Sequence, residues 1–293
     1  MKAEQINPPV RMVDPALSNR AFAFVRRNPT LTIGGCIFAV ILAGALLAPL
    51  APGEAFDMQP ILRMRPPSST SLLGTDQLGR DVLARSLYGG QVSLIVGCSV
   101  TALALTIGIF LGVIAGYFKA ADAPLMRFMD ALMSIPAVLL AIALVALTRP
   151  GVATVVLAIA IPEIPRVVRL VRSVVLSMRG AVFVEAAIVS GSGPAKIIRR
   201  HILPSTVGPL MVQATYICAS AILIEATLSF LGAGAPPEIP TWGNMIAASR
   251  LYLATAPWTI FVPSVFLALT VLSVNLIGDG LRDRLDPRLA RRL

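Results

Sequence analysis

Long stretches without a charged residue are the feature that most constrains the fold of this chain. Five of them run over residues 31–53, 86–118, 131–148, 201–224 and 251–278. A helix needs about 20 residues to cross the roughly 30 Å hydrocarbon core of a bilayer. A membrane-barrel strand would instead show about ten residues of alternating polarity, which these continuous apolar runs lack. The stretches therefore predict an all-α membrane protein.

A sixth, shorter stretch at 150–162 ends before Glu163 and Arg166, so its span must carry polar residues at one end. A mean hydropathy of +0.80 also excludes an ordinary soluble domain. The first stretch exceeds the core of a signal peptide and follows some thirty residues of mixed charge, so we expect a retained helix. We therefore predict six transmembrane helices, at 31–52, 89–117, 122–148, 151–173, 206–231 and 256–278.

The basic residues determine the predicted orientation. With six spans and a cytoplasmic N-terminus, 19 of the 25 Lys and Arg residues fall in cytoplasmic segments and 6 in external ones. This asymmetry follows the positive-inside rule, and it explains the net charge of +10 without a nucleic-acid partner. If 151–173 did not cross, the asymmetry would be lost. We expect both termini, 1–30 and 279–293, in the cytoplasm, and external loops at 53–88 and 232–255.

The cytoplasmic segment 174–205 carries the pattern that bears most on function. It combines short apolar runs with the small residues Ala186 and Ala187, and Gly191 and Pro194 separate one run from the next. Glycine suits a left-handed helix end, and proline suits the first turn of a helix. The residues alone favour equally a compact knob that another protein contacts and a basic amphipathic helix resting on anionic lipid.

The same segment resembles the EAA loop of ABC-importer permeases. The resemblance rests on Glu185-Ala186-Ala187, on Gly191 six residues beyond the glutamate, and on an Ile-Leu-Pro run that ends at Pro204. In that family the loop forms a coupling helix, which seats in a groove of the ATP-hydrolysing subunit. The resemblance implies that Pro204 starts the fifth span. It assigns contacts with the ATPase to Glu185, Ala186, Ala187 and Gly191.

Two further motifs are similar to one branch of that family, the dipeptide, oligopeptide and nickel permeases of the DppC/OppC type. They read LLGTDQLGRDVL over 72–83 and NLIGDGLRDRLDPR over 275–288, and the whole resemblance covers about residues 25–290. It implies a type I ABC-importer permease fold in the bacterial inner membrane and import of small peptides by alternating access. Nickel, opines and glycosides remain alternative solutes.

The resemblance also implies an assembly. The expected partners are a second, homologous permease that forms a heterodimer, one or two ATP-binding subunits, and an external solute-binding protein, all against membrane lipid. ATP and Mg are expected on the ATPase, since each of the three lysines of this chain lacks the following Ser or Thr of a P-loop. We expect no enzyme activity and no cofactor in this chain.

The external loop holds a group of turn glycines and opposite charges just outside the membrane. It could form a salt-bridged cap on the bundle, and the resemblance places it where a solute-binding protein docks, so both roles stay open. Its residues are Gly74, Thr75, Asp76, Gly79, Arg80 and Asp81.

Other residue patterns argue against different classes of function. His201 is the only histidine, and Cys36, Cys98 and Cys218 show no ligand spacing, so no metal site is expected. A membrane-embedded enzyme would need a nucleophile that the sequence does not place beside His201. An ion-coupled secondary transporter would need embedded carboxylates or broken helices in two repeats. For the acids near span ends we expect snorkelling, helix capping or pairing with arginine rather than ligand binding: Asp130, Glu163, Glu225 and Asp279.

Overall fold

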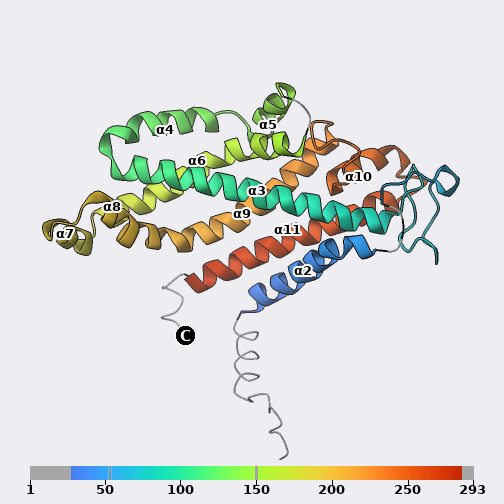
Figure 1. The fold of residues 1–293 in the computed structure, drawn as a ribbon, viewed down its shortest axis with the longest axis horizontal. Helices are drawn as coiled ribbons and strands as arrows, with labels where there is room; N and C mark the ends of the chain where they lie inside the picture. Colours follow the sequence, from blue (N-terminus) through green and yellow to red (C-terminus); the bar gives the residue numbers. More distant parts are fainter. Residues whose placement is uncertain (1–27, 52, 54, 149–150, 286–293) are drawn as a thin grey trace, which may run out of the picture.

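The computed structural model describes residues 28–51, 53, 55–148 and 151–285, so most of the predicted N-terminal segment and part of the tail lie outside the described residues. The long helices run roughly along one axis (Figure 1) and are α2 (Pro29–Leu46), α3 (Val82–Tyr117), α6 (Val152–Arg179), α9 (Leu203–Phe230) and α11 (Trp258–Leu285). The shorter helices are α4 (Lys119–Met133), α5 (Ala137–Ala146), α7 (Val182–Val189), α8 (Pro194–Ile197) and α10 (Trp242–Ser249). Single turns complete the chain: η1 (Ala48–Leu50), η2 (Pro60–Leu62), η3 (Ile198–Ile202) and η4 (Arg250–Tyr252).

Helices α3 and α6 pack closest at the centre of the bundle, because a row of glycines on α3 faces a row of valines on α6. A Cβ atom at any of the three glycines would lie 2.5–2.7 Å from the Cβ of its valine. Small residues spaced four apart allow this close approach of two helices in a membrane. The pairs are Gly108 with Val167, Gly112 with Val171, and Gly116 with Val175.

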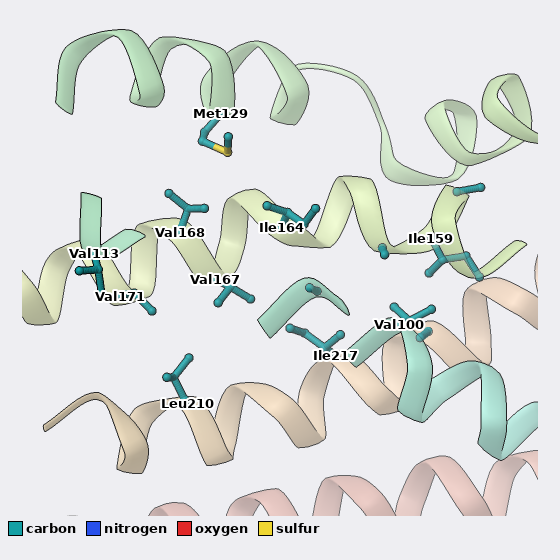
Figure 2. Packing of buried hydrophobic residues seen from close by; sticks show 14 of the residues in the cluster. Val100, Val113, Met129, Ile159, Ile164, Val167, Val168, Val171, Leu210 and Ile217 are labelled. Atoms are coloured by element: carbon teal, nitrogen blue, oxygen red, sulfur yellow. The ribbon is translucent and has the colours of Figure 1, made fainter. Parts of the chain in front are cut away.

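The main hydrophobic core lies between α3, α6 and α9, with α4 covering part of it (Figure 2). Val100 of α3, Ile159 of α6 and Ile217 of α9 are fully buried there, and Met129 reaches in from α4. The core thus joins three of the long helices into one packed unit.

Four helical segments are long and apolar enough to cross a membrane: 29–46, 82–117, 194–230 and 258–285. The helices α4 and α5 would form a fifth crossing if they act as one bent span. Helix α6 has a sufficient length of 28 residues but carries Glu163 and several arginines. These charges set α6 apart from the apolar spans, as the sequence predicts for this segment.

The predicted third span is divided. The chain bends by 86° between α4 and α5, next to Pro136. Proline lacks a backbone N–H group and disfavours the helical conformation of the residue before it, which favours a break in the helix at this point. As a result α4 lies along one half of α6 and α5 along the other (Figure 1).

Two predicted boundaries in the external loops differ from the structure. Helix α3 begins at Val82, inside the loop predicted at 53–88, because the Asp81 carboxylate caps it by accepting from Ala84 N at 2.9 Å. The external loop predicted at 232–255 is not irregular throughout: it contains α10, whose first turn is capped by the Thr241 hydroxyl. Asp81 closely follows Gly79, and Thr241 directly follows Pro240, and these turn residues obscured the helix starts in the sequence.

The first and last described helices, α2 and α11, pack side by side and run in opposite directions (Figure 1). Arg284 Nε donates to Asn28 Oδ1 at 3.0 Å, and Gly280 packs against Leu31. The first and the last described residues therefore lie at the same end of the bundle. Helix α7 extends from the same end, and α10 and the 53–81 loop lie at the other (Figure 1).

Candidate functional site

Helix α7 projects from the end of the bundle and carries the predicted coupling residues. Glu185 and Ala186 are exposed on it, and Ala187 is half-buried. Val184 is fully buried against the body of the protein and anchors the helix. The structure thus holds this short helix in place while it presents the predicted contact residues outward.

The end of α7 is a complete glycine cap. Gly191 has a φ of +78°, and its N–H donates to the carbonyl of Ile188 at 2.9 Å. The next N–H, that of Ser192, donates to the carbonyl of Ala187 at 3.0 Å. These two bonds define a Schellman motif, which needs a left-handed residue and so favours glycine. The helix end predicted from the sequence has this geometry.

The chain after this cap leads into one long helix. From Pro194 to Phe230 the helical path is continuous, with a five-residue π-type turn at Ile198–Ile202. Pro204 lies exposed just beyond this turn, inside the long helix. Because Pro204 has no N–H group, the carbonyl four residues before it loses its usual helical partner, which accounts for the local widening. Helix α7 is therefore joined through a short turn to a long helix that crosses the bundle.

The surface of α7 is more apolar than a solvent-exposed helix normally is. Val182 is 81% exposed and Val189 is 88% exposed, and the side chains of Phe183 and Ile188 are also half exposed. A hollow beside them is lined by basic residues and Pro204: Lys196, Arg199 and Arg200. Apolar residues presented on a protrusion, with basic residues next to them, form a surface suited to contact with another protein. The sequence pattern did not single out Val182 and Val189 as contact residues. The signal that could have done so is a run of apolar residues within a strongly basic segment.

At the opposite end of the bundle the external motif folds around Asp76. One carboxylate oxygen of Asp76 accepts from the backbone N–H groups of Leu78 and Arg80, at 2.8 and 3.0 Å. The other accepts from Arg80 Nε at 2.8 Å, and Arg85 Nε lies 3.6 Å from it. Asp76, Arg80 and Arg85 are all buried. This is the salt-bridged cap predicted as one of two roles for the motif.

The other members of the external motif also have tertiary contacts. The Thr75 hydroxyl accepts from Arg65 N at 2.9 Å and donates to the Leu62 carbonyl, while the Thr75 carbonyl accepts from Trp258 Nε1 at 3.2 Å. Gly74 and Gly79 have φ values of +77° and +78°. A Cβ on Gly79 would lie 1.9 Å from the carbonyl oxygen of Gln59, so only glycine fits there.

A cavity of about 310 Å³ opens beside this motif. Asp76, Arg80 and Arg85 contribute to its wall, and residues between 229 and 237 and of helix α10 form much of the remainder. The cap therefore also forms part of a concave surface at this end of the molecule.

The four predicted acids have different surroundings. Asp130 pairs with Arg169 at 2.6 Å and Glu163 pairs with Arg166 at 3.0 Å, so the expected pairing with arginine is present, although Glu163 lies near the middle of α6 and not at a span end. Glu225 is fully buried and accepts from the Ser229 hydroxyl at 2.8 Å. Asp279 is exposed on α11. Within the described residues, no group of three His, Cys, Asp or Glu side chains is arranged to hold a metal ion.

The profile of the family described as "Binding-protein-dependent transport system inner membrane component" matches residues 73–291, which include the external motif and the α7 loop. The chain belongs to this family. It is therefore a multi-pass protein of the bacterial inner membrane and a permease-type transport component. The matched region covers every predicted site residue.

Similar proteins extend this assignment. The chain is 55% identical over 267 residues to a probable peptide ABC transporter permease of Sinorhizobium fredii, covering 91% of this chain and 92% of the relative. It is 40% identical over 293 residues to the dipeptide transport system permease DppC of Alkalihalophilus pseudofirmus, covering 99% and 96%. It is 41% identical over 266 residues to the di/tripeptide permease DppC of Pseudomonas aeruginosa, covering 88% of each. The resemblance to the DppC-type branch is thus confirmed.

Solved structures show the same fold. The inward-facing MetNI methionine ABC transporter matches with a TM-score of 0.55 at 19% identity, covering 70% of this chain and 96% of that chain. An amino acid ABC transporter matches with a TM-score of 0.53 at 13% identity, covering 68% and 94%. The all-helical ABC-importer permease fold is therefore confirmed.

Proposed function

We propose that this chain is the permease subunit of an ATP-driven importer that moves di- or oligopeptides across the inner membrane by alternating access. The observation that carries the proposal is α7: its exposed apolar residues project from one end of the bundle, and its chain continues directly into the long helix 194–230. A partner that moves α7 would move this helix with it. The peptide class rests on the names of the similar permeases from S. fredii, A. pseudofirmus and P. aeruginosa.

We propose six spans with both termini in the cytoplasm, α4 and α5 forming the third and α6 the fourth. At 1.5 Å per residue, the 28 residues of α6 extend about 42 Å, enough to cross. Three of its arginines are compensated by carboxylates, namely Glu163, Asp130 and Asp122. Pairing lowers the cost of charges within a crossing helix.

Two of the proposed partners match a surface described above. One or two ATP-binding subunits, which would hold ATP and Mg, would receive α7 through Glu185, Ala186, Ala187 and Gly191. A solute-binding protein would dock at the cavity beside Asp76 and Arg80. A second, homologous permease would complete the pathway as a heterodimer. In this assembly the present chain carries no catalytic residue and no cofactor of its own.

The proposal is tested by transport with the complete complex, reconstituted in liposomes with its binding protein and ATPase. ATP-dependent entry of labelled Ala-Ala that persists when ion gradients are abolished supports it. Entry that requires an ion gradient and not ATP would favour the ion-coupled carrier. ATP-dependent entry of nickel, an opine or a glycoside, with no entry of peptides, would keep the importer and replace the solute.

A further inference from the structure

A small polar group lies between α6 and α9, away from both ends of the bundle. Arg166 Nη1 donates to the two carboxylate oxygens of Glu163 at 3.0 and 3.1 Å. The guanidinium carbon of Arg166 lies 5.9 Å from the centre of the Tyr216 ring, within the range of a cation–π contact.

This group lies at the middle of both helices. Arg166 is the fifteenth of the 28 residues of α6, and Tyr216 is the fourteenth of the 28 residues of α9. At 1.5 Å per residue, each is about 20 Å from either end of its helix. With α6 and α9 crossing the bilayer, as proposed above, the group lies near the bilayer midplane.

The three side chains differ in exposure. The Glu163 side chain is fully buried, whereas that of Arg166 is 38% exposed, and Tyr216 is 53% exposed. The guanidinium and the ring therefore open onto the surface of this chain, and the carboxylate lies behind them. A guanidinium at this depth is too costly to face hydrocarbon, so water or another protein must cover it.

We propose that Arg166 and Tyr216 line the solute pathway and that Arg166 binds the terminal carboxylate of a passing peptide. This rests on the proposed function, which supplies a solute with a carboxylate. Within the described residues, Nε and Nη2 of Arg166 have no hydrogen-bond partner, so these two donors of the guanidinium fork are available. An arginine fork matches a carboxylate in a two-point contact.

The ion pair with Glu163 allows such a site to release its ligand. When no solute is bound, Glu163 neutralises the charge of Arg166, and when a solute is bound, Glu163 competes with the solute carboxylate for the same guanidinium. A pathway site must bind strongly enough for entry and weakly enough for exit. Since Glu163 is fully buried, only the Arg166 guanidinium and the Tyr216 ring are accessible to a solute. This exposed cation favours solutes with an anionic end.

The test uses the complete complex in liposomes and compares entry of Ala-Ala with entry of Ala-Ala amide, which lacks the carboxylate. Arg166→Gln is expected to lower Ala-Ala entry about tenfold relative to amide entry, because the charge-assisted contact is lost. Arg166→Lys keeps the charge and is the matched control, with a smaller loss expected. The binding protein is the same in each sample, so its own preference cancels from the ratio of variant to wild type.

If Arg166→Gln lowers the entry of Ala-Ala and of Ala-Ala amide by the same factor, the inference is overturned, and Arg166 is assigned to contact with the second permease. An absence of ATP-dependent Ala-Ala entry in the wild type would instead overturn the proposed peptide function, and this inference with it. The two failures are thus distinguished by the wild-type sample.

A second measurement does not depend on the folding of the Arg166 variants. Tyr216→Cys is made in a chain whose Cys36, Cys98 and Cys218 are replaced by serine, and the assembled complex is treated with a water-soluble methanethiosulfonate reagent. Reaction that is slowed by Ala-Ala and not by Ala-Ala amide supports a pathway site for carboxylates. No reaction, or reaction that neither dipeptide slows, contradicts it.

Discussion

Asp122 of α4 and Arg172 of α6 form a two-point ion pair, with oxygen-to-nitrogen distances of 2.5 and 2.7 Å. Their side chains are 27% and 30% exposed. The pair fixes the start of α4 against α6, just after the chain turns at the end of α3. Its loss should therefore loosen α4 without disturbing the α3–α6 core.

We predict a favourable coupling of about 0.5–1 kcal/mol between Asp122 and Arg172 in a double-mutant cycle to alanine, measured by thermal unfolding in detergent. The matched control is Asp130 with Arg169, which makes a single contact and is about half exposed on both sides. We expect a smaller coupling there because solvent screens that pair. Equal coupling energies for the two pairs would contradict the assigned role of the two-point contact.

The close contact between the glycines of α3 and the valines of α6 leaves no room for a larger side chain at these glycines. Gly112→Ala places a Cβ 2.7 Å from that of Val171 and should destabilise the chain by about 1–3 kcal/mol through overpacking. Gly35→Ala is the control, since a Cβ at Gly35 meets nothing within 4 Å. Thermal unfolding should show a lower midpoint for Gly112→Ala only. A second change, Val171→Ala in the Gly112→Ala chain, should recover part of the loss.

The external motif predicts a difference between two left-handed glycines. Gly79→Ala should lower stability by the left-handed strain of about 1–2 kcal/mol and by a further clash with the Gln59 carbonyl. Gly232→Ala, at φ +82° with nothing within 4 Å, should cost the strain alone. Limited proteolysis of the 53–81 segment should accelerate for Gly79→Ala and not for Gly232→Ala. Similar behaviour of the two variants would show that the contact at Gln59 is unimportant.

Trp242 anchors α10 against α3 and α11. It is fully buried, stacks on Phe266, and donates from Nε1 to the Ser86 carbonyl at 2.9 Å. Trp242→Phe removes this second donor to a carbonyl that keeps its own place in the α3 helix, and should cost about 0.5–1.5 kcal/mol. Trp242→Ala also empties a large volume and should cost more, about 3–5 kcal/mol. Thermal unfolding of both variants beside the wild type checks this order, and a Phe variant as unstable as the Ala variant would be inconsistent with it.

Gly191 predicts a defect in coupling without a defect in packing. No atom of the described chain lies within 4 Å of a Cβ at Gly191, so a side chain there starts in open space, and its cost within this chain is the strain of a φ of +78°. Gly191→Trp should abolish ATP-dependent uptake while the chain still inserts, and Gly191→Asn, which tolerates a positive φ, should retain most of it. Normal uptake by Gly191→Trp at normal expression would remove Gly191 from the coupling contact.

Parts of the fold and site follow from short-range chemistry and could be predicted. Glycine at 191 and proline at 194 encode the end of one helix and the start of the next, and the structure has both. The break next to Pro136 has the same kind of local cause, although its 86° angle depends on packing of α4 and α5 against α6. The charges of α6 marked it in advance as the least apolar crossing.

Other features depend on which helix faces which. The four-residue spacing of Gly108, Gly112 and Gly116 is visible in the sequence, but it does not name α6 as the partner. The external motif closes on Trp258, far along the chain, and no local pattern indicates that contact. Arg166 resembled an ordinary residue at a span end until the structure placed it at mid-helix beside Tyr216.

The most direct test of the central claim is whether the exposed apolar surface of α7 holds the ATPase. The tagged chain is purified in gentle detergent as wild type, as a Val182→Asp and Val189→Asp double variant, and as the control Leu251→Asp, which changes a residue of similar exposure at the opposite end. We predict that the ATPase co-purifies with the wild type and with Leu251→Asp and is lost from the α7 variant. Retention of the ATPase by the α7 variant, or no ATPase with the wild type, would contradict the coupling role of this helix.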